Sequence, residues 1–182
     1  MSLFKSDTGS RMRNPGRRDF LSGHFRTATN KPAAIRPPWA SEISIAEACT
    51  GCGACRDACP EQIIVTSDDA TPRVDFSAGE CSFCGDCAAV CPEPVFTETD
   101  ATPWHLSLTI AESCLATSGV YCRSCGDACA PRAITFQPEV GGKARILFSQ
   151  SDCSGCGACV SVCPVNAVSL APLEIHPGDE IA

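Results

Sequence analysis

Short apolar runs separated by turn-forming residues recur along the body of the chain. Two pairs of short strand-like segments each flank a turn: residues 63–65 with 73–76, the latter with alternating polar and apolar side chains, and residues 134–136 with 144–148. Pro72 ends the first turn, and Gly141 and Gly142 form the second. Apolar runs of this length on both sides of a turn predict two β-hairpins.

A third pattern covers residues 104–110, where apolar and polar side chains alternate. This alternation has the period of a β-strand with one buried face, so the segment predicts a further strand. All of the predicted strands lie between groups of cysteines.

The cysteines form four groups that recur at a period of about 32 residues, which indicates an internal repeat. Three groups have the spacing C-x2-C-x2-C-x3-C and are followed by proline: Cys49, Cys52, Cys55 and Cys59; Cys81, Cys84, Cys87 and Cys91; and Cys153, Cys156, Cys159 and Cys163. The third group in chain order is irregular, because seven residues separate its first two cysteines; it is Cys114, Cys122, Cys125 and Cys129. The last two cysteines of every group lie one helical turn apart, so we expect a short helix there.

The composition changes how these groups are interpreted. Cysteine makes up about 9% of the 182 residues and aromatic residues only 6%, which leaves little material for a packed core. Disulfide scaffolds, zinc proteins and iron–sulfur proteins all have such a cysteine content. The first residues contain no apolar stretch of signal-peptide length, which favours a reducing compartment and disfavours disulfides. Zinc is disfavoured because His24, His105 and His176 lie outside the groups.

The spacing of the regular groups is that of bacterial [4Fe–4S] sites. The first three thiolates lie on one loop around a cubane cluster, and the fourth binds the other cluster of a pair. Glycines in the groups let the backbone approach, so that amide N–H groups can point at sulfur. We therefore predict four [4Fe–4S] clusters whose insertion is coupled to folding. The fold class is α+β: two tandem bacterial two-cluster ferredoxin-like modules, with short hairpins and short helices around the clusters.

Because the fourth ligand crosses to the other cluster, the spacing also predicts four ligand sets. With neighbouring groups paired, they are Cys49, Cys52, Cys55 and Cys91 (site 1); Cys81, Cys84, Cys87 and Cys59 (site 2); Cys114, Cys122, Cys125 and Cys163 (site 3); and Cys153, Cys156, Cys159 and Cys129 (site 4). We prefer this pairing, but the segments that join the groups are similar in length. A nested pairing, first group with fourth and second with third, therefore stays open, as does full occupancy of site 3.

Charge is divided unevenly along the chain. Residues 1–36 carry a net charge of +6 and the remainder carries −13. The acidic body argues against nucleic acid as a partner, because phosphates would be repelled. The predicted organisation is a basic, partly disordered arm over residues 1–39, two ferredoxin modules over 40–101 and 102–173, and a C-terminal tail over 174–182. Pro37 and Pro38 stiffen the end of the arm, and Trp39 is expected to anchor it on the body.

Outside the cysteine groups, the sequence contains no catalytic constellation and no nucleotide-binding glycine pattern, which indicates a protein that is not an enzyme. Trp104 and Tyr121 are expected to be packing residues and not redox relays. The uncharged stretch over residues 153–173 contains too much glycine, proline and serine for a membrane-spanning helix.

The body resembles tandem two-cluster ferredoxins, and the chain as a whole resembles the NapF family, ferredoxin-type accessory proteins of the periplasmic nitrate reductase system. The matching segments extend from about residue 13 to 170; they are residues 17–21, 35–39, 80–84 and 120–125 and the last cysteine group. The resemblance implies a cytoplasmic protein that acts on the catalytic subunit of the nitrate reductase before its export, in cluster assembly or electron supply. A general polyferredoxin electron carrier, an electron-transfer subunit of another redox complex and a structural iron–sulfur protein remain the alternatives.

Residues 17–21 look like the core of a twin-arginine export signal. The residues that follow are polar and cationic, and they lack the apolar stretch of roughly 7–15 residues that export needs. We therefore expect the protein to stay in the cytoplasm, with Arg17 and Arg18 in a docking element for a partner of the same pathway. The alternative for this arm is a solvated basic tail.

Overall fold

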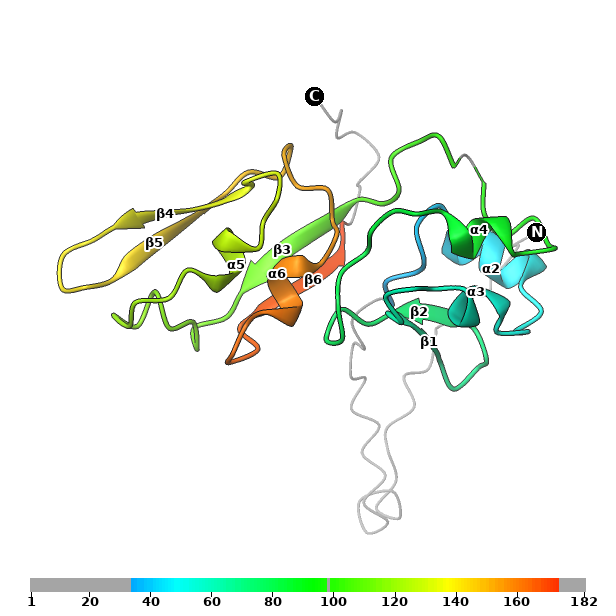
Figure 1. Cartoon of the computed structure of the whole chain (residues 1–182), viewed down its shortest axis with the longest axis horizontal. Helices are drawn as coiled ribbons and strands as arrows, with labels where there is room; N and C mark the ends of the chain where they lie inside the picture. The colour runs from blue at the N-terminus through cyan, green and yellow to red at the C-terminus, as the bar shows by residue number, and fades with distance from the viewer. Residues whose placement is uncertain (1–33, 98, 174–182) are drawn as a thin grey trace, which may run out of the picture. The chain divides into compact units, whose positions relative to one another are not determined.

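One helical turn joins the last two cysteines of every group. The computed structural model describes residues 34–97 and 99–173 (Figure 1). The four turns are α3 (Ala54–Asp57), α4 (Asp86–Ala89), α5 (Ser124–Asp127) and α6 (Ala158–Ser161). Three of them follow a glycine, Gly53, Gly85 or Gly157, whose φ lies at 79°, 81° or 84°. Glycine adopts this left-handed conformation without strain, so the chain can turn sharply between the second and third cysteines.

The irregular third group begins its helix differently. The residue before α5 is Arg123, with φ at −136°, outside the left-handed region. Because Cys114 lies much further from Cys122 than its counterparts do in the regular groups, the backbone reaches the helix without the sharp glycine turn.

Both predicted hairpins are present in the structure. They are β1 (Ile64–Thr66) with β2 (Pro72–Val74), and β4 (Ile134–Pro138) with β5 (Ala144–Phe148), each pair antiparallel. Gly141 and Gly142 lie between β4 and β5 with φ values of 85° and 78°, as a tight turn requires.

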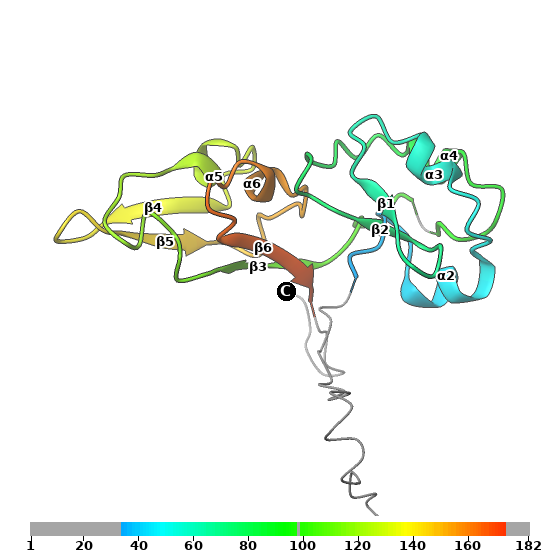
Figure 2. The same ribbon diagram turned by 90° about the horizontal axis from the view of Figure 1, so that it is seen from below.

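The alternating segment forms β3 (Leu106–Ile110), as the pattern predicts. Its antiparallel partner is β6 (Val168–Pro172), which the sequence pattern did not reveal, and Ile110 lies opposite Val168. Figures 1 and 2 show the two strands side by side. The start and the end of the second predicted module are thus joined by hydrogen bonds.

The first predicted module has no equivalent of this outer strand pair in its described residues. A single antiparallel bridge between Ala40 and Phe96 stands in its place. Pro37 and Pro38 precede the bridge, and proline cannot donate to a strand ladder, so the pairing cannot extend in that direction. The chain continues from the bridge into the helix α2 (Glu42–Ala48).

Residues 34–40, here called the strap, are fastened along the first module. The Ile35 carbonyl accepts a hydrogen bond from the Val74 amide at 2.7 Å. Arg36 donates from its side chain to the Glu42 carboxylate at 2.7 and 2.8 Å. Trp39 donates its indole N–H to the Ala101 carbonyl at 3.0 Å, which confirms its predicted role as an anchor.

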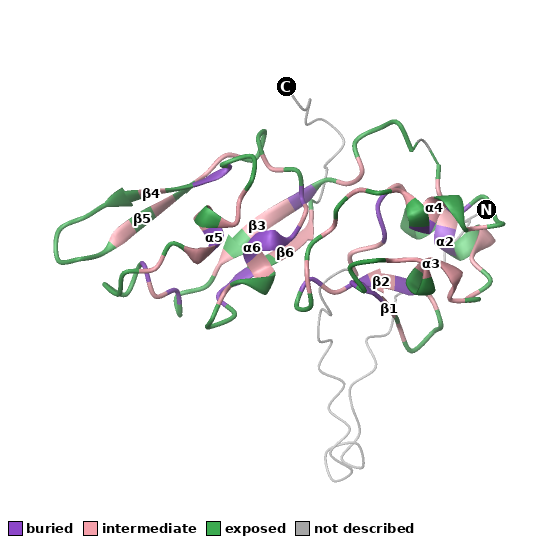
Figure 3. Ribbon diagram, in the orientation of Figure 1, coloured by how far each residue is buried: buried purple, intermediate pink, exposed green. Residues whose placement is uncertain are grey.

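Cysteines form part of the buried core. Cys87 lies in one cluster with Ile63 and Phe76, and Cys125 and Cys159 belong to a second. Figure 3 shows that fully buried positions are scattered in short stretches between exposed ones. The small core agrees with the low aromatic content and implies that the groups bound by the cysteines complete the interior.

The chain divides into two units, residues 1–31 and 32–182, and every described residue belongs to the second. Arg17 and Arg18 lie outside the described residues. The predicted boundaries of the arm, the two modules and the tail stay predictions. Within residues 34–97 and 99–173, no helix combines the length and the apolar character needed to cross a membrane.

Candidate metal centres

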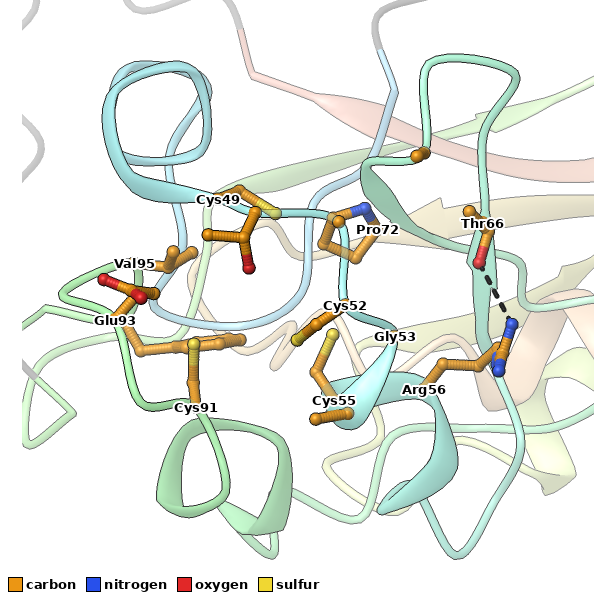
Figure 4. A pocket seen from close by; sticks show the side chains of 15 residues that line it. Cys49, Cys52, Gly53, Cys55, Arg56, Thr66, Pro72, Cys91, Glu93 and Val95 are labelled. Atoms are coloured by element: carbon orange, nitrogen blue, oxygen red, sulfur yellow. Dashed lines mark hydrogen bonds between the residues drawn. The ribbon is translucent and has the colours of Figure 1, made fainter.

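The first ligand set surrounds one enclosed pocket. Cys49, Cys52, Cys55 and Cys91 all line it, and no other cysteine does (Figure 4). Cys49 and Cys52 lie on the loop that leads into α3, Cys55 lies within α3, and Cys91 is the last cysteine of the second group. Burial raises the pKa of the Cys55 thiol, and the nearby Cys49 and Cys91 raise it further. Neighbouring groups therefore meet here as the crossing rule predicts.

A second pocket collects the complementary set. Its cysteines are Cys59, Cys81, Cys84 and Cys87. Burial raises the pKa of the Cys81 thiol to about 11, with a contribution from Cys59. The apolar part of the lining includes Ile63 and Val74, so the pocket borders directly on the core.

The irregular third group also assembles four cysteines. Burial raises the pKa of the Cys125 thiol to about 11, and the next contributions come from Cys114, Cys122 and Cys163. Cys114 is buried, and Cys163 packs against the small cluster that contains it. The long spacing between Cys114 and Cys122 therefore does not separate these thiols.

The fourth set is organised around Cys159. Burial raises the pKa of this thiol to about 12, and Cys156, Cys153 and Cys129 are among the neighbours that raise it. Cys153 has a raised pKa with the same order of causes, burial first and then Cys156 and Cys129. Cys129 of the third group is thus a neighbour of the fourth group, and the crossed pairing of these two groups stays a prediction.

The raised pKa values of the buried thiols mean that a metal centre must displace protons when it binds. Burial also raises the pKa of Cys87 to about 12. Such thiols keep their protons near neutral pH, whereas a metal centre binds the thiolate. Binding therefore has to displace protons from several buried sulfurs at once, which couples occupation of the sites to closure of the fold.

Backbone amides point at several of these sulfurs, as expected from the sequence. The amides of Phe83 and Gly155 hydrogen-bond the thiols of Cys81 and Cys153, two equivalent positions in two groups. The Ala167 amide donates to Cys163 Sγ at 3.2 Å. N–H donors near sulfur stabilise the thiolate and tune a bound metal centre.

Four sets of four thiols, each with amide donors, fit [4Fe–4S] clusters chemically. Each thiolate of such a set binds a different iron, so the sulfurs need not converge on one point. In the described residues, no three Cys, His, Asp or Glu side chains do converge on a single metal position. The helices of neighbouring groups pack together, α3 with α4 and α5 with α6, which favours neighbouring over nested pairing. The assignment of individual ligands to individual clusters stays a prediction.

The two aromatic residues singled out in the sequence have different environments. Trp104 packs edge-on against Phe76 and Phe83, as expected for a packing residue. Tyr121 is 87% exposed, so the expectation that it packs in the interior was wrong. The reason is its place in the stretch between Cys114 and Cys122, which lies on the surface at residues 117–121. A sequence signal does separate the two residues, because Trp104 begins the alternating segment 104–110 and Tyr121 lies in no predicted strand or helix.

The iron content of the loaded protein tests whether the irregular third group holds a complete cluster. Anaerobic reconstitution is expected to load about sixteen irons and about sixteen sulfides per chain. Cys114→Ser should lower the iron content towards about twelve, since one site loses a ligand. Tyr121→Ser, in the same stretch but exposed, serves as the control and should leave it unchanged. Iron and acid-labile sulfide analysis measures both, and a wild-type plateau near twelve that Cys114→Ser does not alter would contradict a full third site.

The chain matches known proteins over nearly its whole length. Residues 48–95 and 120–167 each match the family model of the 4Fe-4S dicluster domain. The ferredoxin-type protein NapF of Haemophilus influenzae is 44% identical over 169 residues, which cover 88% of this chain and 96% of that protein. NapF of Escherichia coli is 41% identical over 161 residues with the same coverage. The ferredoxin-type protein NapG of Escherichia coli is 32% identical over 181 residues, 85% of this chain and 77% of that protein.

Two dicluster domains correspond to four [4Fe–4S] clusters, and the sixteen cysteines of the chain match that number. The protein therefore binds four [4Fe–4S] clusters in two tandem modules of mixed α and β structure.

Proposed function

The chain belongs to the NapF family of ferredoxin-type iron–sulfur proteins, and on that premise we propose that it assists the maturation of the catalytic subunit of the periplasmic nitrate reductase. In this proposal the protein works in the cytoplasm, before the subunit is exported, and supplies electrons or helps to assemble the subunit's cluster. The observation that carries the proposal is similarity to NapF proteins along almost the full chain, the strap included.

The chain's own residues have a supporting part in this role. When bound, each cluster exchanges one electron at a time. The thiolates hold the clusters, the amides of residues such as Phe83 and Gly155 lie against the sulfurs, and buried apolar side chains limit the access of water. Nothing in this arrangement requires a catalytic site in the protein itself, which is why we propose electron transfer or assembly and not turnover of a substrate.

The basic arm is proposed as the docking element, with Arg17 and Arg18 in contact with the partner. Its charge of +6 contrasts with −13 on the remainder, so an acidic face of a partner would be attracted to the arm and repelled by the body. Such attraction speeds encounter and orients the partner. The last residues of the arm belong to the strap, which is fastened to the first module by hydrogen bonds.

Affinity purification tests the maturation role. The tagged full-length protein is purified from anaerobic cells that contain or lack the catalytic subunit. We expect the subunit to be recovered with the protein, in its unexported form and without other redox enzymes. Recovery of several unrelated redox enzymes in equal amounts, or of none, would instead indicate a general electron carrier.

The arm is tested by charge removal. Arg17→Ala combined with Arg18→Ala should weaken binding of the purified subunit by roughly tenfold or less at low salt, because exposed charge pairs contribute little each. Arg11→Ala with Arg13→Ala removes the same charge from the same arm and is the matched control; it should have a smaller effect. Binding isotherms at two salt concentrations measure this, with iron content as a check on folding. Equal losses of binding affinity in the two double variants would show that the arm acts only as a non-specific basic tail.

A further inference from the structure

The second and fourth cysteine groups touch each other directly. The backbone N–H of Cys81 donates a hydrogen bond to the carbonyl oxygen of Cys156 at 2.8 Å. Both residues are proposed ligands, the first of site 2 and the second of site 4. One backbone hydrogen bond therefore joins two proposed ligand residues of different modules.

Aromatic side chains from both modules, Phe76 and Phe83 of the first and Trp104 of the second, pack around this contact. Phe76 meets Trp104 edge-on with ring centroids 5.8 Å apart, and Phe83 meets the same indole at 6.0 Å. A Cβ atom on Gly155 would overlap Trp104, and one on Gly157 would overlap the ring of Phe76. The loop of the fourth group can thus lie against these rings only because it carries glycine at both positions.

Inside each module, a different pair of cysteines brings two sites together. Cys55 of site 1 packs against the core cluster that contains Cys87 of site 2. Cys125 of site 3 and Cys159 of site 4 belong to one core cluster. Contacts therefore run from site 1 to site 2, from site 2 to site 4, and from site 4 to site 3.

We propose that the contact between Cys81 and Cys156 is an electron junction that joins the two modules in series, with sites 2 and 4 inside and sites 1 and 3 at the ends. One electron leaves a reduced site on one side and arrives at an oxidised site on the other; no bond is made or broken and no proton moves. Phe76 and Trp104 are positioning residues, which hold the two loops in contact. The proposal rests on the ligand sets and not on any partner.

Two variants of the full chain test the order of the sites. One keeps only sites 2 and 4, by serine substitution of the first three ligands of sites 1 and 3: Cys49, Cys52, Cys55, Cys114, Cys122 and Cys125. The other keeps only sites 1 and 3, by the same change at Cys81, Cys84, Cys87, Cys153, Cys156 and Cys159. Each should hold about eight irons. After reduction with dithionite, electron paramagnetic resonance should show spin coupling and fast relaxation in the first variant only.

A sum of two isolated spectra in the first variant, or coupling in the second, would overturn the proposed order. No partner protein takes part, so this outcome leaves the maturation role untouched.

A second measurement uses the fully loaded chain. Gly157→Ala should separate the loops by pushing on Phe76 and should slow the relaxation of the reduced clusters. Gly85→Ala is the matched control, because it has the same left-handed strain but a Cβ there meets nothing within 4 Å. Identical relaxation in Gly157→Ala and Gly85→Ala, at equal iron content, would show that the junction does not couple the modules.

Discussion

Removal of the clusters with an iron chelator under anaerobic conditions is expected to unfold the protein. The helices of the cysteine groups contain four residues each, far fewer than an isolated helix needs. The three sheets found in residues 34–97 and 99–173 have two strands each, which is also marginal in water. All sixteen cysteines are free, so no disulfide replaces the lost connections. Loss of most of the far-UV circular dichroism and loss of amide protection against hydrogen exchange should follow.

The control for this experiment is the return of the clusters. Addition of iron and sulfide to the stripped chain should restore both signals, because the buried thiols can again exchange protons for metal. A cluster-free chain that still unfolds in a single cooperative transition would show that side-chain packing alone maintains the fold.

The second large effect concerns the crossing of ligands between neighbouring groups. Cys91 follows α4 in sequence but lines the pocket of Cys49, Cys52 and Cys55. Cys91→Ser should therefore remove about four irons from site 1 and leave site 2 loaded. Cys59→Ser is the mirror-image variant, since Cys59 lines the pocket of the second group, and should empty site 2 instead.

Reference variants identify which site is lost. Cys52→Ser damages site 1 within its own group, and Cys84→Ser does the same for site 2. The reduced spectrum of Cys91→Ser should match that of Cys52→Ser, and Cys59→Ser should match Cys84→Ser. A Cys91→Ser spectrum equal to that of Cys84→Ser would refute the crossing, and one equal to a site 3 variant would support the nested pairing.

The parts of the fold that the sequence predicts are those with a local cause. The hairpins around Pro72 and around Gly141 and Gly142 have apolar runs next to turn residues, and both are present. The one-turn helices follow from the four-residue spacing of the last two cysteines. The spacing also predicts the crossed grouping of the thiols; Cys91 and Cys59 line the pockets expected of them, and the ligand assignment itself stays a prediction.

The features that the sequence did not reveal depend on residues far apart in the chain. The strand β6 has polar Ser169 and terminal Pro172, and only its pairing with β3 makes it a strand. The helix α2 does have a local signal, a capping box formed by Ser41 and Ser44, but Ser44 stands where the usual pattern has Glu or Gln. The close contact between Gly157 and Phe76 is not indicated by the sequence pattern around either residue.

The pairing of β3 with β6 has a consequence for the order in which the protein can be made. During synthesis, residues up to Cys91 complete the two thiol sets of the first module while the ribosome is still translating the second. The second module has to wait, because Ile110 pairs with Val168 and Cys125 lies near Cys163. A chain released before these residues lacks both the partner strand of β3 and the Cys163 thiol, so the proposed third ligand set stays incomplete and the β3 edge stays unpaired.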